Sequence, residues 1–342
     1  MRRSIKRLVA VAASGATAAL GLSVAAVPAQ AATDIKVGVV AINSTGALQY
    51  AIDSGIFRKN GINVTEVVVF PAPPPGIAAL ASGAVQFTYT PTIPAINAYE
   101  NGGINLRIVA PADGYTRAQL AAAKKNPKVA AQLDDTGVCA SPSAGISRWR
   151  DLEGKTVAVP ARGAQAEVTI VAAVKNDGGN PASIKWTTLP PGQAVDAAKS
   201  GRIDAGFTVE PFVTECINQG LQNVGRPGVE FFDTESAIGV WVTTAPYAQA
   251  NPKVVEAFQK SMYEAHQYAM KSKANMNRVM RASTKITEVT PEVALAANPP
   301  IYPLFVTQVD VIRPAQKMLN LGFLSKKADT AGLLLKQYRP RR

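Results

Sequence analysis

Residues 151–212 constrain the fold most, because they predict one complete unit of alternating strands and helices. A short apolar run at residues 156–160 ends in a proline, as expected for a buried parallel strand. A glycine-containing turn follows, and a helix is expected over residues 164–176. A second strand, a second helix and residues 201–212 complete the unit. The first helix would point its free N–H groups at the carboxyl end of the preceding strand, which is a geometry suited to an anion.

Four segments in matching order carry a resemblance to a known family. Two of them read DLEGKTVAVP (residues 151–160) and SGRIDAGFTVEPF (residues 200–212). They resemble the second lobe of the nitrate, sulfonate and taurine family of ABC-transporter substrate-binding proteins, relatives of the thiamine-pyrimidine precursor binders. Residues 48–64 and 79–86 resemble segments of the first lobe, so the likeness spans about residues 34–335. It implies an α/β periplasmic binding protein of type II, with two lobes that are each a mixed sheet flanked by helices, and a ligand cleft between them.

The first 31 residues have the form of a cleaved secretory signal peptide. Basic residues precede an apolar, Ala-rich stretch that ends in Ala29-Gln30-Ala31, a small-x-small cleavage site. The alternative is an uncleaved membrane anchor. No cysteine follows the apolar stretch, so a lipoprotein is not expected. The predicted location is therefore periplasmic or extracytoplasmic.

The length of 342 residues exceeds one comfortable hydrophobic core, so two lobes are expected. We predict lobe 1 over residues 32–138 and 236–342, and lobe 2 over residues 139–235. The two crossings between lobes would form a hinge, and closure about a hinge traps ligand. Apolar spacing near three and four predicts helices that wrap lobe 1 at residues 252–272, 275–281, 291–297 and 306–321.

The chain is basic, with 36 Lys and Arg against 24 Asp and Glu. The positive charge is scattered and no basic stripe interleaved with aromatic residues appears, so nucleic acid is not an expected partner. The basic segment 115–135 is expected to be a solvated helical face. The tail 339–342 is expected to be disordered.

Candidate ligand contacts in the first lobe follow strand ends, where α/β proteins place their ligands. The polar loop after the strand at residues 34–40 holds Ser44 and Thr45, which would cap the next helix, alone or with an added ligand contact. Tyr89 and Thr90 end a second strand, with core filling as the alternative role of Tyr89. Pro73-Pro74-Pro75 is expected to be extended, as a pocket floor or a rigid connector.

In the second lobe the candidates gather at the predicted helix start. Arg162 would offer a forked donor pair to a carboxylate or sulfonate, beside backbone N–H groups. Ala164 stands where the family more often shows Ser or Thr, which puts a simple sulfonate site in doubt. Glu210 would reach a ligand or tie the hinge, and Trp241 would form a flat wall. The full candidate set is Asn43, Ser44, Thr45, Gln49, Tyr89, Thr90, Arg162, Gly163, Ala164, Gln165, Glu210 and Trp241.

Catalytic and metal chemistry find little support in the sequence. The single histidine, His266, is expected on a helix surface, and the two cysteines form no close-spaced pair, so no metal site is expected. No P-loop, nucleophile elbow or supported carboxylate pair appears. The Cys-rich motif and active-site histidine of the pyrimidine-forming relatives are also missing. We therefore expect no enzyme activity and no cofactor.

The predicted function is solute capture for an ABC importer by lobe closure, with a membrane permease and ATPase as partners and a monomeric protein. The expected solute is a small organic anion, either an aliphatic sulfonate or an aromatic carboxylate such as phthalate. The alternatives are an enzyme or a receptor-sensor subunit on the same scaffold. Cys139 and Cys216 are either free or bridged, and an exported pair makes a bridge the working hypothesis.

Overall fold

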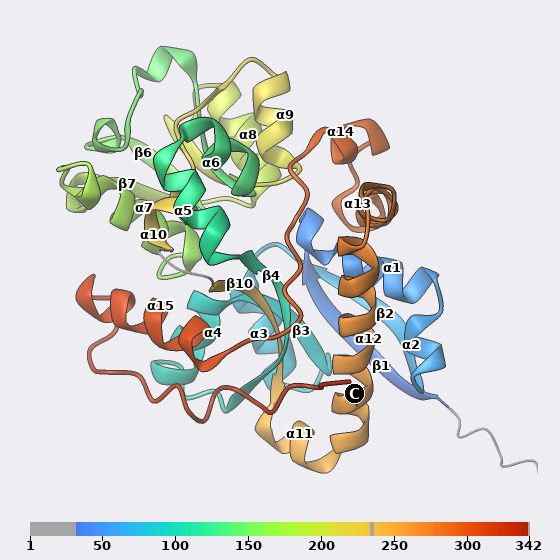
Figure 1. Ribbon diagram of the computed structural model, residues 1–342. Coiled ribbons are helices and arrows are strands. Elements are labelled where there is room, and N and C mark those ends of the chain that lie inside the picture. Colours follow the sequence, from blue (N-terminus) through green and yellow to red (C-terminus); the bar gives the residue numbers. More distant parts are fainter. Residues whose placement is uncertain (1–31, 233–235, 341–342) are drawn as a thin grey trace, which may run out of the picture. The chain divides into compact units, whose positions relative to one another are not determined.

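The structure is a computed structural model that describes residues 32–232 and 236–340 (Figure 1). Residues 32–342 form one compact unit. The signal peptide predicted for residues 1–31 and the tail residues 341 and 342 lie outside the described residues. Within the described part, no helix is both long and apolar enough to span a bilayer.

The first sheet has the strand order β2-β1-β3-β10-β4. β1 runs parallel to β2 and β3, whereas β10 runs antiparallel to β3 and β4. Successive residues of β10 face opposite sides, so Val240 and Trp241 join the two separate cores that cover the sheet. The strands are β1 Thr33–Val40, β2 Ile62–Phe70, β3 Phe87–Pro91, β4 Leu106–Tyr115 and β10 Ser236–Thr244.

The second sheet has the order β7-β6-β8-β5-β9. β6 runs parallel to β7 and β8, and β5 runs antiparallel to β8 and β9. The strands are β5 Thr136–Ala140, β6 Thr156–Val159, β7 Lys185–Thr188, β8 Ala205–Val209 and β9 Gln222–Asn223. The chain enters this sheet between β4 and β5 and leaves it between β9 and β10. Two mixed sheets flanked by helices confirm the predicted α/β, two-lobed fold.

Helices cover both sheets. They are α1 Gly46–Asp53, α2 Ile56–Lys59, α3 Pro73–Ala81, α4 Thr92–Glu100, α5 Arg117–Lys125, α6 Pro127–Leu133, α7 Gln165–Asn176, α8 Pro191–Lys199, α9 Phe212–Asn218, α10 Pro227–Phe231, α11 Ala245–Ala250, α12 Pro252–Met270, α13 Lys273–Thr287, α14 Pro291–Ala296 and α15 Gln308–Asn320. The four helices predicted after the return crossing are confirmed as α12 to α15. Three of them pack on the first lobe, with α12 and α13 beside α1 and α15 beside α4 and β10, while α14 contacts both α13 and α9 (Figure 1).

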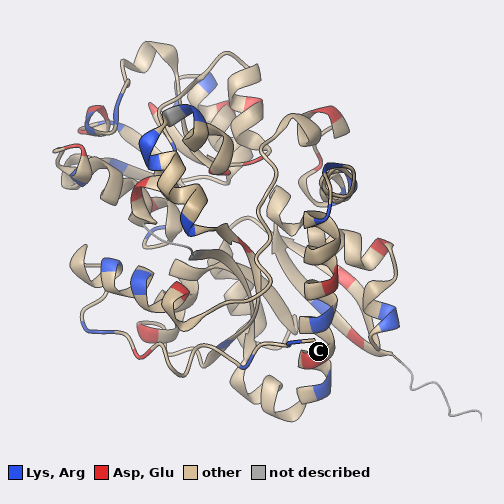
Figure 2. Ribbon diagram, viewed as in Figure 1, with Lys and Arg blue, Asp and Glu red and all other residues tan. Residues whose placement is uncertain are grey.

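The basic segment 115–135 forms α5 and α6. Lys124, Lys125 and Lys128 are exposed, which confirms a solvated face. Figure 2 shows Lys and Arg residues distributed over many helices of the unit. This distribution agrees with the scattered positive charge seen in the sequence.

Three local predictions are wrong. Pro73 to Pro75 do not form an extended loop but begin α3, because a proline ring suits the first helical turn, where no N–H bond is needed. Neither Ser44 nor Thr45 caps α1 through its side chain, since both lie in the 3-10 turn Asn43–Thr45 and their hydroxyls donate elsewhere. His266 is not on a helix surface but fully buried.

Candidate functional site

A cavity of about 610 Å³ lies between the two sheets. Its lining residues follow the carboxyl ends of strands from both lobes, namely β1, β2 and β3 of the first sheet and β6, β7 and β8 of the second. Ligand sites of α/β proteins occupy this position, and the volume lies within the range of small-molecule pockets, roughly 300 to 1,000 Å³.

Apolar groups make most of the cavity wall. Phe70, Phe207 and Phe212 contribute aromatic rings, and Tyr89 adds a ring with a hydroxyl group. Six prolines with fixed backbone angles also line the cavity, at positions 71, 73, 91, 160, 190 and 191. The wall is therefore apolar and largely preformed.

Two buried carboxyl groups form the polar centre of the cavity. Asp113 comes from β4 and Asp135 from the segment that crosses to β5. Their side chains are joined by Ser44, whose Oγ lies 2.9 Å from Asp113 Oδ2 and 3.1 Å from Asp135 Oδ2. The hydroxyl of Tyr89 lies 3.5 Å from Asp113 Oδ1. Four groups from distant parts of the chain thus meet at one point.

Burial changes the protonation of this pair. It raises the pKa of Asp113 to about 6, although hydrogen bonds from Ser44 and from the backbone of Gly239 act in the opposite direction. Burial also raises the pKa of Asp135 well above its ordinary value, and the nearby charge of Asp113 adds to the effect. Two carboxyl groups this close resist full ionisation. The two carboxyl groups therefore take up protons at a higher pH than exposed carboxyl groups do.

The anion site predicted at the start of α7 is filled by the protein itself. The carboxylate of Glu167 accepts from Arg162 Nε at 2.9 Å and Nη2 at 2.8 Å, and from the backbone N–H of Gly163 at 2.6 Å. The guanidinium also lies 5.6 Å from the ring centroid of Trp186. Arg162 and Gly163 thus already have an anionic partner, and neither lines the cavity.

Of the twelve candidate residues, Tyr89, Ala164 and Gln165 line the cavity. Gln165 is buried and its Oε1 has no hydrogen-bond partner. Ser44 does not line the cavity, but its hydroxyl lies within hydrogen-bond distance of Asp113 and Asp135, which do. The remaining eight lie outside the lining and are Asn43, Thr45, Gln49, Thr90, Arg162, Gly163, Glu210 and Trp241.

Several of these eight residues have clear structural contacts. Trp241 is fully buried in the first lobe, where its ring packs edge-on against Tyr89 and Phe258. Gln49 donates to Asp53 on the exposed side of α1. Thr45 donates to the Ile42 carbonyl. These hydrogen bonds account for Gln49 and Thr45 without a ligand, whereas Trp241 Nε1 is buried with no hydrogen-bond partner.

Glu210 lies where the lobes meet. Its carboxylate accepts from the Thr214 N–H at 3.0 Å and the Asn298 N–H at 3.4 Å, while its own carbonyl accepts from the Asn43 N–H at 3.0 Å. Another bond between the lobes runs from Asn97 Nδ2 to the Gly163 carbonyl at 3.1 Å. The contacts of Glu210 fit the hinge-tying role weighed in the sequence.

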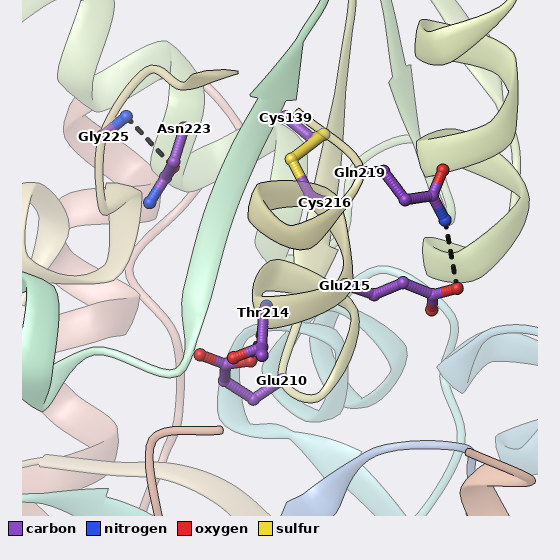
Figure 3. Close-up of a disulfide and its surroundings, with 8 residues drawn as sticks. All are labelled: Cys139, Glu210, Thr214, Glu215, Cys216, Gln219, Asn223 and Gly225. Carbon is purple, nitrogen blue, oxygen red and sulfur yellow. Dashed lines mark hydrogen bonds between the residues drawn. A yellow bond between two sulfur atoms is a disulfide. The ribbon is translucent and has the colours of Figure 1, made fainter. Parts of the chain in front are cut away.

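Cys139 and Cys216 are joined in the structure (Figure 3). The sulfur atoms are 2.06 Å apart and the Cα atoms 6.2 Å apart. The bond ties β5 to α9, and both elements belong to the second lobe. Each end lies close in sequence to a cavity-lining residue, Thr136 on β5 and Phe212 at the start of α9.

Sequence reasoning missed the Asp113 and Asp135 pair. The two residues stand 22 positions apart and come together only because β4 and the crossing segment meet. A usable signal was present, since Asp113 falls in an apolar segment and Asp134-Asp135 directly precedes an apolar strand. Carboxylates in such places are seldom buried without a partner.

Comparisons with known proteins identify the family to which this chain belongs. The profile of the NMT1-like family matches residues 29–283. The taurine-binding periplasmic protein of Escherichia coli (strain K12) is 32% identical over 127 residues, which is 36% of this chain and 38% of that protein.

Two solved structures share the fold. The alkanesulfonate-binding protein of Xanthomonas axonopodis pv. citri, bound to MOPS, superposes with a TM-score of 0.71 at 16% identity, covering 89% of this chain and 99% of that one. The periplasmic nitrate-binding protein of Synechocystis PCC 6803 gives 0.71 at 15% identity, covering 89% and 86%.

Proposed function

Because the chain belongs to the NMT1-like family, we propose that it is the extracytoplasmic solute-binding component of an ABC importer. Membership agrees with the resemblance to nitrate, sulfonate and taurine binding proteins inferred from the sequence. In this proposal the signal peptide is cleaved, the protein acts as a monomer, and a membrane permease and ATPase receive the solute.

The observation that carries the proposal is the cavity of about 610 Å³ between two lobes linked by two crossings. A solute held there touches both lobes, so its binding energy favours the closed arrangement. Relatives named for taurine, alkanesulfonate and nitrate binding support solute capture as the role of the cavity.

The organic anion expected from the sequence, an aliphatic sulfonate or an aromatic carboxylate, draws its support from the names of these relatives. The lining of this chain departs from a simple anion site. Arg162 is engaged by Glu167, and the two carboxyl groups of Asp113 and Asp135 are buried in the cavity lining. A ligand panel therefore has to span both signs of charge.

A calorimetric thermal-unfolding screen tests solute capture. The purified protein is unfolded with amines, carboxylates, sulfonates, nitrate and neutral alcohols. A ligand that binds only the folded form at a hundredfold excess over its dissociation constant stabilises the protein by about 2.7 kcal/mol. Recovery of the bound compound unchanged, followed by NMR, separates capture from turnover. Loss of solute uptake on gene deletion separates import from sensing.

A matched pair of variants locates the binding. Ala164→Trp places an indole in the cavity and should abolish the stabilisation by any ligand. Ala121→Trp makes the same change at an exposed position of α5 and should leave it intact. Stabilisation that survives in Ala164→Trp would place the binding site elsewhere and contradict the proposal.

A further inference from the structure

Hydrogen-bond acceptors dominate the buried polar lining of the cavity. The side chains of Asp113, Asp135 and Gln165 are only 3%, 7% and 7% exposed. The Oε1 atom of Gln165 has no partner, and a buried acceptor left unpaired is costly. The acceptors come from both sides of the cavity, since Gln165 begins α7 in the second lobe. A ligand that satisfies them has to bring N–H or O–H groups.

The two short contacts of Ser44 favour a carboxyl pair that carries one proton. Ser44 Oγ lies within hydrogen-bond distance of both Asp113 and Asp135. A hydroxyl has one hydrogen, so it donates to one carboxylate at a time. The second short contact is satisfied when the other carboxyl carries a proton and donates to Ser44. The pair then carries one negative charge in total.

Charge in and around the pair is mostly negative. Among the described residues that line the cavity, Lys285 is the only basic one, and its Nζ lies 2.8 Å from Asp53 Oδ1. Asp196 and Glu288 add two more carboxyl groups to the lining. The other titratable and charged groups facing the pair are Tyr89, Asp134, Glu210 and Tyr302, with Arg226 3.9 Å from Glu210.

We propose that the solute is a small organic amine or amidine with an apolar body, whose protonated nitrogen donates to Asp113, Asp135 and Gln165. The inference rests on the function proposed above and names its substrate class. The phenylalanine and proline walls receive the apolar body. The pair with one proton carries a single negative charge, which matches the single positive charge of the bound cation. An organic anion would instead meet the pair with like charge.

Isothermal titration calorimetry at pH 7.5 tests the proposal with matched head groups on phenethyl, indolylethyl and cyclohexylethyl bodies. Each body carries an ammonium, a carboxylate, a sulfonate or a hydroxyl group. At least one amine should bind tenfold or more tightly than its carboxylate, sulfonate and alcohol counterparts. Its affinity should rise from pH 5 to pH 7.5, because burial raises the pKa of Asp113 to about 6 and the pair gains its negative charge over this range. Near pH 5 its binding enthalpy should vary with the ionisation enthalpy of the buffer, since the amine then displaces a proton from the pair.

Three variants locate the contact. Asp135→Asn should weaken binding of that amine by about tenfold to a hundredfold, because a charge-assisted bond is lost. Glu66→Gln removes an exposed carboxyl of β2 that pairs with Lys36 and should change nothing. If Asp135→Asn fails to fold, Gln165→Leu in the other lobe carries the test and should weaken binding at least severalfold.

Each contrary result has a distinct meaning. Anions that bind when no amine does overturn the amine assignment but leave solute capture standing. An amine that binds equally to Asp135→Asn, to Gln165→Leu and to the unaltered protein also overturns it. If no compound of either charge binds measurably, and no neutral alcohol does, both proposals are overturned.

Discussion

Acidification should destabilise this protein through one buried histidine. His266 lies in α12 with no exposed surface, where its ring stacks on Tyr302 at a centroid distance of 4.7 Å. Its Nδ1–H donates to the Pro303 carbonyl at 2.8 Å, and Nε2 has no partner. Burial lowers the pKa of His266 to about 4, although the bond to Pro303 acts in the opposite direction.

The sign and size of the effect follow from linkage. The unfolded chain binds a proton on His266 below about pH 6.5, whereas the folded chain binds it only below about pH 4. The free energy of unfolding therefore falls as the pH drops through this window. The loss is about 2.5 kcal/mol at pH 4.5, relative to pH 7.5, and approaches about 3 kcal/mol at lower pH. The raised pKa values of Asp113 and Asp135 act in the opposite direction.

Comparison with variants isolates the histidine, because the carboxyl contributions cancel in the difference. His266→Phe keeps a ring against Tyr302 and His266→Gln keeps an N–H donor. At pH 7.5 the Phe variant should be about 1 kcal/mol less stable than the unaltered protein, owing to the unpaired Pro303 carbonyl. Between pH 7.5 and 4.5, urea unfolding should show both variants losing about 2.5 kcal/mol less than the unaltered protein. An equal loss in all three proteins would refute the assignment.

Three further predictions concern the disulfide, the filled anion site and a close backbone contact. Thiol labelling of denatured, unreduced protein should find no free thiol, and two thiols should appear after reduction. Replacing both cysteines, by Cys139→Ala and Cys216→Ala, should lower the free energy of unfolding by about 4 kcal/mol, since the bond spans 77 residues. Arg162→Ala should change ligand affinity by less than about twofold in calorimetry, because Arg162 lies outside the cavity lining and its guanidinium is paired with Glu167. Gly239→Ala would place a methyl carbon 1.9 Å from Asp113 Oδ1, so it should displace that carboxyl and reduce ligand affinity at least tenfold, and unchanged affinity would show that Asp113 is not a ligand contact.

The fold could be predicted because its signals are local. Apolar runs bounded by proline and glycine give β6 and the start of α7, and apolar spacing gives α12. The same spacing indicates that His266 is buried, because it stands four residues after the buried Met262 and so falls on the inner face of α12. The expectation of a surface position followed residue type rather than periodicity.

The site was harder to predict because its polar groups meet only after folding. Asp113 and Asp135 are joined by Ser44, which lies 69 and 91 residues away from them. Arg162 illustrates a different difficulty. The sequence predicts its position beside a helix start, but the carboxylate that neutralises it, that of Glu167, lies within the helix itself. Trp241 sits in a run of apolar residues, so the sequence could not assign it to the core or to the cavity wall.

The hydrogen bonds between the lobes have a kinetic consequence. A solute enclosed in the cavity leaves after the lobes part, so its residence time depends on breaking bonds such as Asn43 N–H to Glu210 and Asn97 Nδ2 to Gly163. A net contribution of about 1 kcal/mol per bond corresponds to roughly fivefold in the rate of opening. The bond to Gly163 uses the side chain of Asn97, which does not line the cavity, so Asn97→Ala should hasten release while leaving every cavity-lining residue in place. Dwell time and ligand choice can thus change independently in this protein.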